Sequence, residues 1–296
     1  MSASSFASAV GIPLPPISIV DVGAMSDGVD RYANLLEHGL ASVVGFEPNP
    51  AELTRLVARG APRCRYLPDC LGKGGPAVLH LTLYPGCTSL YRPNVPLIEL
   101  FQGIGAADEN GNFFVFREEP VQTRRLDDVV ECPPPDFLKL DVQGAELDVL
   151  EGACDKLWGT LVVEAEVEFV QLYENQPLFG DVDRFLRTHG FVLHKMIDIA
   201  GRALIPFRIN NSDTAPSSQL LWADAVFVRD FTHLERFSDE QLLKTATILH
   251  EAYRSDDLAF HFLREYDRRR GTQTGQAFIH YLTSNGVKVF FMNVLS

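Results

Sequence analysis

Short apolar runs, rich in β-branched residues, alternate with segments of helical spacing over the first quarter of the chain. Three such runs, at 17–22, 42–46 and 64–67, are typical of buried strands. Between them, apolar residues recur every three or four positions over 27–40 and 51–59, and a glycine lies at the end of each segment. The order strand–helix–strand–helix–strand, with short connections, predicts a parallel, doubly wound α/β sheet.

The pattern changes beyond residue 70. Alternating apolar and polar positions over 77–84, a Pro-Gly turn, and strand-like runs at 112–117 and 121–125 predict a β-hairpin insertion over 77–130, at the sheet edge or extending it. The remaining elements expected, in chain order, are a strand at 137–142, a helix at 145–157, a strand at 160–164, a helix at 181–189 and strands at 191–199 and 220–228.

The two ends of the chain differ from the part between them. Residues 1–16 are rich in Ser and Ala and contain three prolines near their end, which predicts a flexible leader. Residues 17–230 are expected to form the main α/β domain. In residues 231–296, Ser238 begins an N-cap signal, and apolar residues on one face predict two successive helices. We expect a helical C-terminal appendage, packed on the core or used for homo-oligomerisation.

Composition and charge narrow the partner classes. The 26 Lys and Arg against 39 Asp and Glu give a net charge of −13. An acidic surface repels phosphate backbones and anionic lipid, so we expect neither nucleic acid nor a membrane surface as partner. No apolar stretch reaches the ~18 residues of a spanning helix. Five cysteines, an odd number without a CxxC motif, favour reduced thiols. We therefore expect a cytoplasmic protein without a membrane span.

The first candidate site is the turn that follows the first strand. Gly23 allows the backbone to approach a ligand closely, and Gly28 follows near the start of the next helix. The pattern is not GxGxxG, and Asp21 would repel a pyrophosphate; it would suit an ammonium or sulfonium group. A plain tight turn is the alternative interpretation.

Two more carboxylates follow the next two strands. Glu47, framed by Pro48 and Asn49, lies 24 positions after Gly23, a spacing at which an acidic side chain can accept the hydroxyl protons of a ribose. The alternative is a solvent-facing carboxylate. Asp69 ends the third strand and could accept a hydrogen bond from an adenine amino group, or simply form a turn after Pro68.

Two acidic positions are candidates for the chemistry itself. Asp141 ends an apolar strand, and its partner could be a substrate hydroxyl, a ligand ammonium, a metal ion or the amides of the next helix. In the run that follows, Glu164, Glu166 and Glu168 share one face of a strand. We expect Glu164 to point into the site and the other two to be solvated.

Five segments in order resemble the FkbM family of S-adenosylmethionine-dependent methyltransferases: Val20-Asp-Val-Gly-Ala24, Gly45-Phe-Glu-Pro-Asn-Pro50, Thr88-Ser-Leu90, Thr123-Arg-Arg-Leu-Asp-Asp128 and Asp136-Phe-Leu-Lys-Leu-Asp-Val-Gln-Gly-Ala-Glu146. The resemblance covers residues 17–230. It implies the class I methyltransferase fold, which is Rossmann-like, with a mostly parallel sheet and a reversed last strand. It also implies O-methylation of a hydroxyl on a sugar, glycan or natural product.

The resemblance implies roles for particular residues. Glu47 would hold the ribose of the cofactor S-adenosylmethionine. Seven more residues would bind the cofactor: Asp21, Gly23 and Ala24 near the methionine part, and Pro48, Asn49, Asp69 and Cys70. Asp141 would face the reaction centre. From their position at the carboxyl edge of the sheet, we expect Asp141 or Glu164 to act as the base, or as ligand of a divalent metal ion that acidifies the hydroxyl. Ser89 and Tyr91 would line the acceptor site, unless that loop is an ordinary hairpin connection.

The sequence departs from the family's usual motifs at two places. Met25 stands where the family has Asn, with one residue added before Gly28, and Gln143 replaces a Glu. The altered first turn motivates a second hypothesis, a catalytically degenerate scaffold that binds the cofactor. A third, an NAD-dependent oxidoreductase, shares the fold rhythm and the acidic ribose residue, but the missing GxGxxG motif and Asp21 disfavour it.

Overall fold

The computed structural model describes residues 6–26, 28–215 and 219–289. Residues 1–5 of the expected leader, position 27 of the expected first helix and residues 290–296 of the expected appendage lie outside this part. The chain divides into two compact units. One contains residues 18–28 and 43–230, and the other contains residues 1–17, 29–42 and 231–296.

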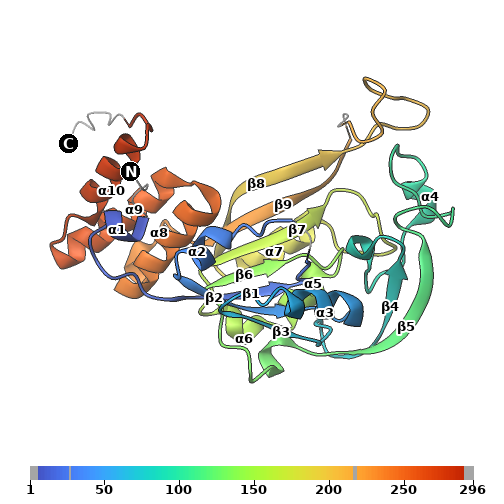
Figure 1. Ribbon diagram of the computed structural model, residues 1–296, viewed down its shortest axis with the longest axis horizontal. Helices are drawn as coiled ribbons and strands as arrows, with labels where there is room; N and C mark the ends of the chain where they lie inside the picture. Colours follow the sequence, from blue (N-terminus) through green and yellow to red (C-terminus); the bar gives the residue numbers. More distant parts are fainter. Residues whose placement is uncertain (1–5, 27, 216–218, 290–296) are drawn as a thin grey trace. The chain divides into compact units, whose positions relative to one another are not determined.

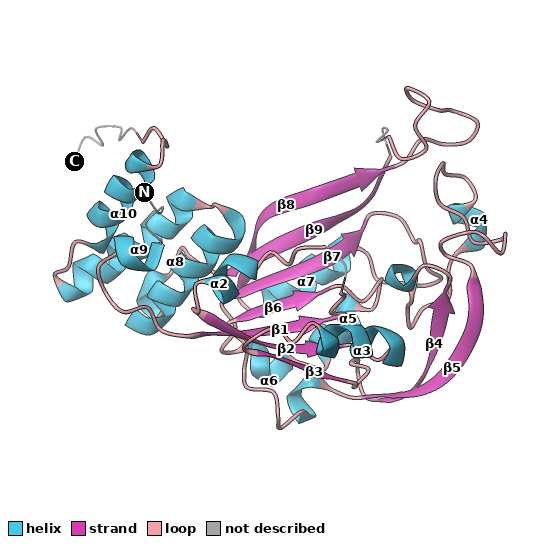
Figure 2. Ribbon diagram, viewed as in Figure 1, coloured by secondary structure: helices cyan, strands magenta, loops and turns pink. Residues whose placement is uncertain are grey.

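A seven-stranded sheet has the order β3-β2-β1-β6-β7-β9-β8 (Figures 1 and 2). Its strands are β1 (Ile17–Val22), β2 (Ala41–Phe46), β3 (Cys64–Leu67), β6 (Phe137–Leu140), β7 (Val162–Glu168), β8 (Phe191–Gly201) and β9 (Leu220–Arg229). The pairs β1–β6, β2–β3 and β6–β7 are parallel, whereas β9 runs antiparallel to both β7 and β8. The predicted class I fold, a mostly parallel sheet with a reversed last strand, is confirmed.

One face of this sheet forms a hydrophobic core. Alternate residues of four strands point to it because side chains along a strand alternate between faces. They are Val20 and Val22, Leu138 and Leu140, Val163 and Ala165, and Ala225 and Phe227. Buried side chains of α5 (Glu146–Glu151), α6 (Cys154–Leu157) and α7 (Phe179–Thr188) belong to the same core, so these helices cover this face.

The helix expected over 145–157 is two short helices, α5 and α6, because the chain turns at Gly152. A Cβ at Gly152 would lie 2.2 Å from the carbonyl oxygen of Gly72, so only glycine allows this close approach. The helix expected over 27–40 is reduced to α2 (Ala33–Glu37), since Gly28 has φ +80, outside the right-handed helical region. The helix expected over 51–59 is α3 (Pro50–Ala58), and Asn49 caps it by accepting a hydrogen bond from the N–H of Ala51.

The predicted insertion is a separate two-stranded antiparallel sheet of β4 (Gly75–Thr82) and β5 (Val115–Thr123). It does not extend the edge of the large sheet. The two strands expected on either side of Pro120 are one continuous strand, β5. Pro120 pairs with Val78. A proline is tolerated there because each strand of a two-stranded sheet has one free edge. Between the strands lie a 3₁₀ turn (Pro85–Cys87) and α4 (Val95–Ile98), over a small core that includes Phe101, Phe113 and Tyr173.

The second unit is mainly helical. It contains α1 (Phe6–Ala9), α2, α8 (Asp239–Tyr253), α9 (Asp256–Arg270) and α10 (Thr274–Ser284). Where the sequence led us to expect a loose leader, Phe6 is buried and stacks on His250 at 4.8 Å, with Phe278 edge-on at 5.2 Å. Ser238 caps α8 as expected, and with Gln241 it forms a capping box. None of the described helices has both the length and the apolar character needed to cross a bilayer.

Substitution of Gly23 would test the close contact between the turn after β1 and the segment after β6. Its φ is +83, and an added Cβ would lie 1.9 Å from the carbonyl oxygen of Asp141. Gly28 has nearly the same φ, +80, but no atom lies within 4 Å of an added Cβ. We expect Gly28→Ala to lower the free energy of unfolding by about 1 kcal/mol, and Gly23→Ala by roughly 3 kcal/mol or more, because the clash adds to the backbone strain. Urea unfolding measures both; equal losses would contradict the close approach.

Candidate functional site

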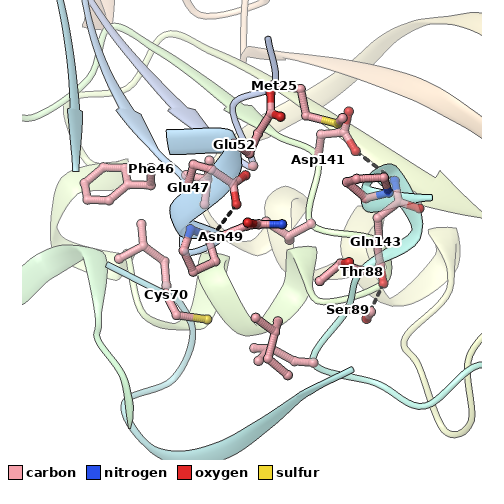
Figure 3. Close-up of a pocket in the computed structure, with 18 of the residues that line it drawn as sticks. Met25, Phe46, Glu47, Asn49, Glu52, Cys70, Thr88, Ser89, Asp141 and Gln143 are labelled. Carbon is pink, nitrogen blue, oxygen red and sulfur yellow. Dashed lines mark hydrogen bonds between the residues drawn. The ribbon is translucent and has the colours of Figure 1, made fainter. Parts of the chain in front are cut away.

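A cavity opens at the carboxyl ends of β1, β2 and β6, where open α/β sheets place their ligands (Figure 3). It encloses about 700 Å³ of space free of atoms, part of it open to solvent. Its wall includes the turn after β1, the β2–α3 connection, the loop after β3, the loop carrying Thr88 and the loop carrying Gln143. The fold thus gathers residues that are up to about 120 positions apart in sequence.

The turn after β1 is fixed by its neighbours on both sides. The N–H groups of Gly23 and Ala24 both donate to the carbonyl of Phe46, at 3.0 and 3.1 Å. On the other side, the N–H of Asp141 donates to the carbonyl of Val22 at 2.9 Å. The ends of β2, β1 and β6 are therefore tied together at the cavity wall.

Glu47 is the acidic side chain at the end of β2. Its carboxylate accepts a hydrogen bond from the N–H of Asn49 at 2.6 Å and lines the cavity beside Pro48 and Asn49. Burial raises the pKa of Glu47 to about 7. A second carboxylate, Glu52 of α3, also lines the cavity; it accepts from the N–H of Ser26 at 2.5 Å and from Arg55 at 3.0 Å.

The loop after β3 brings Asp69 and Cys70 into the cavity wall. Asp69 forms an ion pair with Arg124, with Nη1 and Oδ1 3.0 Å apart. Burial raises the pKa of the Cys70 thiol to about 11, so the thiol is protonated at neutral pH.

Gln143 is the centre of a hydrogen-bond network in the cavity wall. Its Nε2 donates to Oδ1 of Asp141 at 2.9 Å and to Oε2 of Glu166. Its Oε1 accepts from the hydroxyl of Tyr173 at 3.1 Å, and its backbone carbonyl accepts from the hydroxyl of Ser89 at 2.6 Å. Gln143 has φ +55, a left-handed conformation that costs free energy for a residue with a side chain.

Buried carboxylates surround this network. Burial, and after it the charge of Asp141, raises the pKa of Glu166 well above its ordinary value. Burial also raises the pKa of Glu146, which accepts from the N–H of Val142 at 2.8 Å. Glu168 is therefore buried and not solvated as the sequence led us to expect, and Glu166 is half-buried.

Most of the predicted site residues meet at the cavity. Its lining includes Gly23, Glu47, Pro48, Asn49, Asp69, Cys70, Ser89 and Asp141. Asp21 is 1% exposed and pairs with Lys139 at 3.3 Å, and Ala24 is also buried; neither is among the lining residues. The hydroxyl of Tyr91 donates to the carboxylate of Asp148 at 3.1–3.2 Å, and Tyr91 does not line the cavity either.

Glu164 lies elsewhere than expected. It is buried in the middle of β7, opposite Lys139, and it is not among the residues lining the cavity. The register of β6 and β7 explains the difference: Leu140 pairs with Ala165, so the end of β6 at Asp141 comes level with Glu166. Glu166, two residues further along the same strand face, is the one tied to the cavity wall through Gln143.

The cavity lining also includes residues to which the sequence analysis gave no binding role. Met25, Glu52 and Thr88 line the cavity (Figure 3). Glu52 lies in the first turn of α3, directly after the loop that carries Glu47. The N-cap at Asn49, which fixes the start of this helix, could have indicated that Glu52 lies near the site. Among the described residues, no group of three or more His, Cys, Asp and Glu side chains is arranged to hold a metal ion.

Comparisons with known proteins agree with this architecture. A family model described as the methyltransferase FkbM domain matches residues 21–193. No match was found among curated protein sequences. Among solved structures, a candidate methyltransferase from Thermoplasma acidophilum has a TM-score of 0.35 and 10% identity, covering 73% of this chain and 69% of that chain.

Two further solved structures are also similar. A 16S rRNA (adenine(1408)-N(1))-methyltransferase from Catenulisporales acidiphilia has a TM-score of 0.32 and 14% identity, over 77% of this chain and 94% of that chain. M. jannaschii TYW2 in complex with AdoMet has a TM-score of 0.28 and 13% identity, over 76% and 74%. Such distant similarity concerns the fold and not the activity.

One expectation about partners is corrected by these comparisons. The net charge led us to exclude nucleic acid, but an rRNA methyltransferase is among the proteins to which the chain is similar. The exclusion was wrong because a net charge sums over the whole surface, whereas a partner meets one local part of it.

Glu168 provides a test of the buried carboxylates. It is 3% exposed, and burial raises its pKa to about 7. Because the carboxylate is less favourable in the folded protein than in the unfolded chain, wild-type stability should fall as pH rises from about 5 to 8. We expect Glu168→Gln to be more stable than wild type at about pH 8, by up to about 3 kcal/mol, and to lose this advantage near pH 5.

Urea unfolding at the two pH values makes the measurement. The exposed Glu109→Gln variant is the control, with no difference expected at either pH. A Glu168→Gln advantage that does not change with pH would refute the burial argument.

Proposed function

Because this chain belongs to the FkbM methyltransferase family, we propose that it transfers the methyl group of S-adenosylmethionine to a hydroxyl group of a sugar, glycan or natural product. The observation that carries the cofactor assignment is the charge of the cavity. Its described lining contains four carboxylates, those of Glu47, Glu52, Asp69 and Asp141, and no Lys, Arg or His. Such a cavity suits the cationic sulfonium and repels a dinucleotide pyrophosphate, which disfavours the NAD-dependent alternative.

The cofactor roles follow the positions of the lining residues. Glu47 would accept hydrogen bonds from the ribose hydroxyls, with Pro48 and Asn49 fixing its loop. Asp69 and Cys70 would lie beside the adenine. Gly23 would face the methionine part.

Asp21 and Ala24 would act from behind the cavity wall. Asp21 is paired with Lys139, and the N–H of Ala24 holds the turn against Phe46.

Asp141 is the proposed base for the acceptor hydroxyl. It lines the cavity, and the amide of Gln143 holds one of its oxygens. When bound, S-adenosylmethionine would supply an electrophilic methyl group with a good leaving group. The chain's own task is then to orient the hydroxyl and remove its proton. Ser89 would line the acceptor side, and its hydroxyl is fixed on the carbonyl of Gln143.

A cofactor-binding scaffold without turnover is the second candidate. It is favoured by Met25, which departs from the family's motif and whose side chain lines the cavity near Asp141 (Figure 3). Acceptor turnover separates it from the enzyme.

Ligand-induced stabilisation tests the cofactor. We expect S-adenosylmethionine and S-adenosylhomocysteine to raise the thermal unfolding midpoint of wild type, and NAD to leave it unchanged. At a hundredfold excess of ligand over Kd, binding adds ~2.7 kcal/mol to the free energy of unfolding. Glu47→Ala should lose the shift because the ribose acceptor is removed, whereas the exposed control Glu109→Ala should keep it. A shift with NAD alone would replace the proposal with an oxidoreductase.

Asp141→Asn tests the base. The amide keeps the shape of the side chain but cannot take a proton at neutral pH. We expect S-adenosylhomocysteine binding to change less than threefold, and methyl transfer to hydroxyl acceptors found by screening to fall by about 10²-fold or more. The exposed Asp108→Asn variant is the control. Wild-type turnover in Asp141→Asn would remove this residue from the mechanism, and no turnover of wild type on any hydroxyl acceptor would favour the scaffold.

A further inference from the structure

Arg124 holds the loop that carries Asp69 and Cys70. Its backbone N–H donates to the carbonyl of Cys70 at 2.9 Å, and its carbonyl accepts from the N–H of Gly72 at 3.0 Å. This single bridge, opposite Leu71, joins the end of the inserted hairpin to the cavity loop. The loop therefore has a fixed backbone where it meets the cavity.

The guanidinium of Arg124 is itself held in one orientation. Nη1 donates to Oδ1 of Asp69 at 3.0 Å, while Nη2 donates to the carbonyl of Asp128 at 3.0 Å and lies 3.7 Å from Oε2 of Glu131. Because the guanidinium is planar, the bond from Nη2 to the carbonyl of Asp128 also fixes the direction in which Nη1 points. Arg124 therefore restrains the torsion of the Asp69 carboxylate.

The ion pair leaves one oxygen of Asp69 for a ligand. Asp69 lines the cavity, and within the described residues only Oδ1 receives a hydrogen bond. Oδ2 is an acceptor whose direction is set by the bond on the other oxygen. A carboxylate that can only accept selects a ligand with an N–H or O–H donor.

We infer that Arg124 is a positioning residue: it orients Asp69 so that Oδ2 accepts a hydrogen bond from the 6-amino group of the cofactor's adenine. The inference rests on the proposed function. Arg124 does not touch the base in this arrangement and acts only through Asp69. The pair thereby selects adenine over purines that lack an amino donor at that position.

Binding of two ligands by calorimetry tests the inference without an acceptor. The ligands are S-adenosylhomocysteine and its 6-deamino purine analogue, which lacks only the amino donor. We expect wild type to prefer S-adenosylhomocysteine by about tenfold or more, the value of a hydrogen bond to a charged group. In Arg124→Met, the Kd of S-adenosylhomocysteine should rise about tenfold while that of the analogue stays unchanged, so the preference disappears.

Four further variants sharpen the result. Asp69→Ala should show the same loss, and the double variant should lose nothing more, since both residues act through one hydrogen bond. Arg124→Lys keeps the charge but cannot reach Asp69 and the Asp128 carbonyl together, so it should lose part of the preference; it also serves if Arg124→Met does not fold. Arg65→Met, on an exposed residue of β3, is the matched control and should retain the wild-type preference.

Each other result overturns the inference. Equal weakening of both ligands in Arg124→Met would make Arg124 merely structural. Equal wild-type affinity for both ligands would remove Asp69 from the adenine site while leaving the cofactor in place. If wild type binds neither ligand, the proposed function fails and the inference fails with it.

Discussion

The contact between Gly23 and the backbone of Asp141 is the constraint on which the site depends. A Cβ at Gly23 would meet the carbonyl oxygen of Asp141 at 1.9 Å, so the two segments can meet only if position 23 is glycine. This approach brings the turn after β1 against the end of β6. The ligand-facing turn and the proposed base thus belong to one rigid wall, which the hydrogen bonds to Val22 and Phe46 complete.

Charge is the second constraint, and it acts against stability. Four carboxylates line the cavity, and Glu146, Glu166 and Glu168 lie behind its wall. The three carboxylates behind the wall would be more stable as ions in water, which is why burial raises their pKa values. The fold keeps this arrangement where a cationic ligand would offset part of the cost. A site that is electrostatically unfavourable when empty is well suited to bind a sulfonium.

The sequence predicted the sheet well because its strands are short, apolar and bounded by turn residues. The observed β3, Cys64–Leu67, matches the expected span, and β1 does as well. Glu47 and Asp69 could be found because each ends a strand, and the ends of parallel strands meet at one edge. Glu164 was mistaken for Glu166 because alternation fixes the face of a strand but not where the neighbouring strand ends; only the β6–β7 register supplies that. The break at Gly152 depended on the distant Gly72, and the buried position of Phe6 depended on His250, so no local pattern could reveal either.

The glutamine at position 143, where the family usually has glutamate, follows from its neighbours. A glutamate there would place a third carboxylate between those of Asp141 and Glu166, and like charges so close together would force protonation or displacement. The amide instead donates to both of them, and its oxygen accepts from Tyr173. The left-handed backbone at Gln143 costs about 1–2 kcal/mol, and the hydrogen bonds of the amide and of the backbone carbonyl to Ser89 offset this cost. The departure from the family's motif is therefore a local solution to crowded negative charge, and it leaves Asp141 at the cavity wall with one oxygen already fixed.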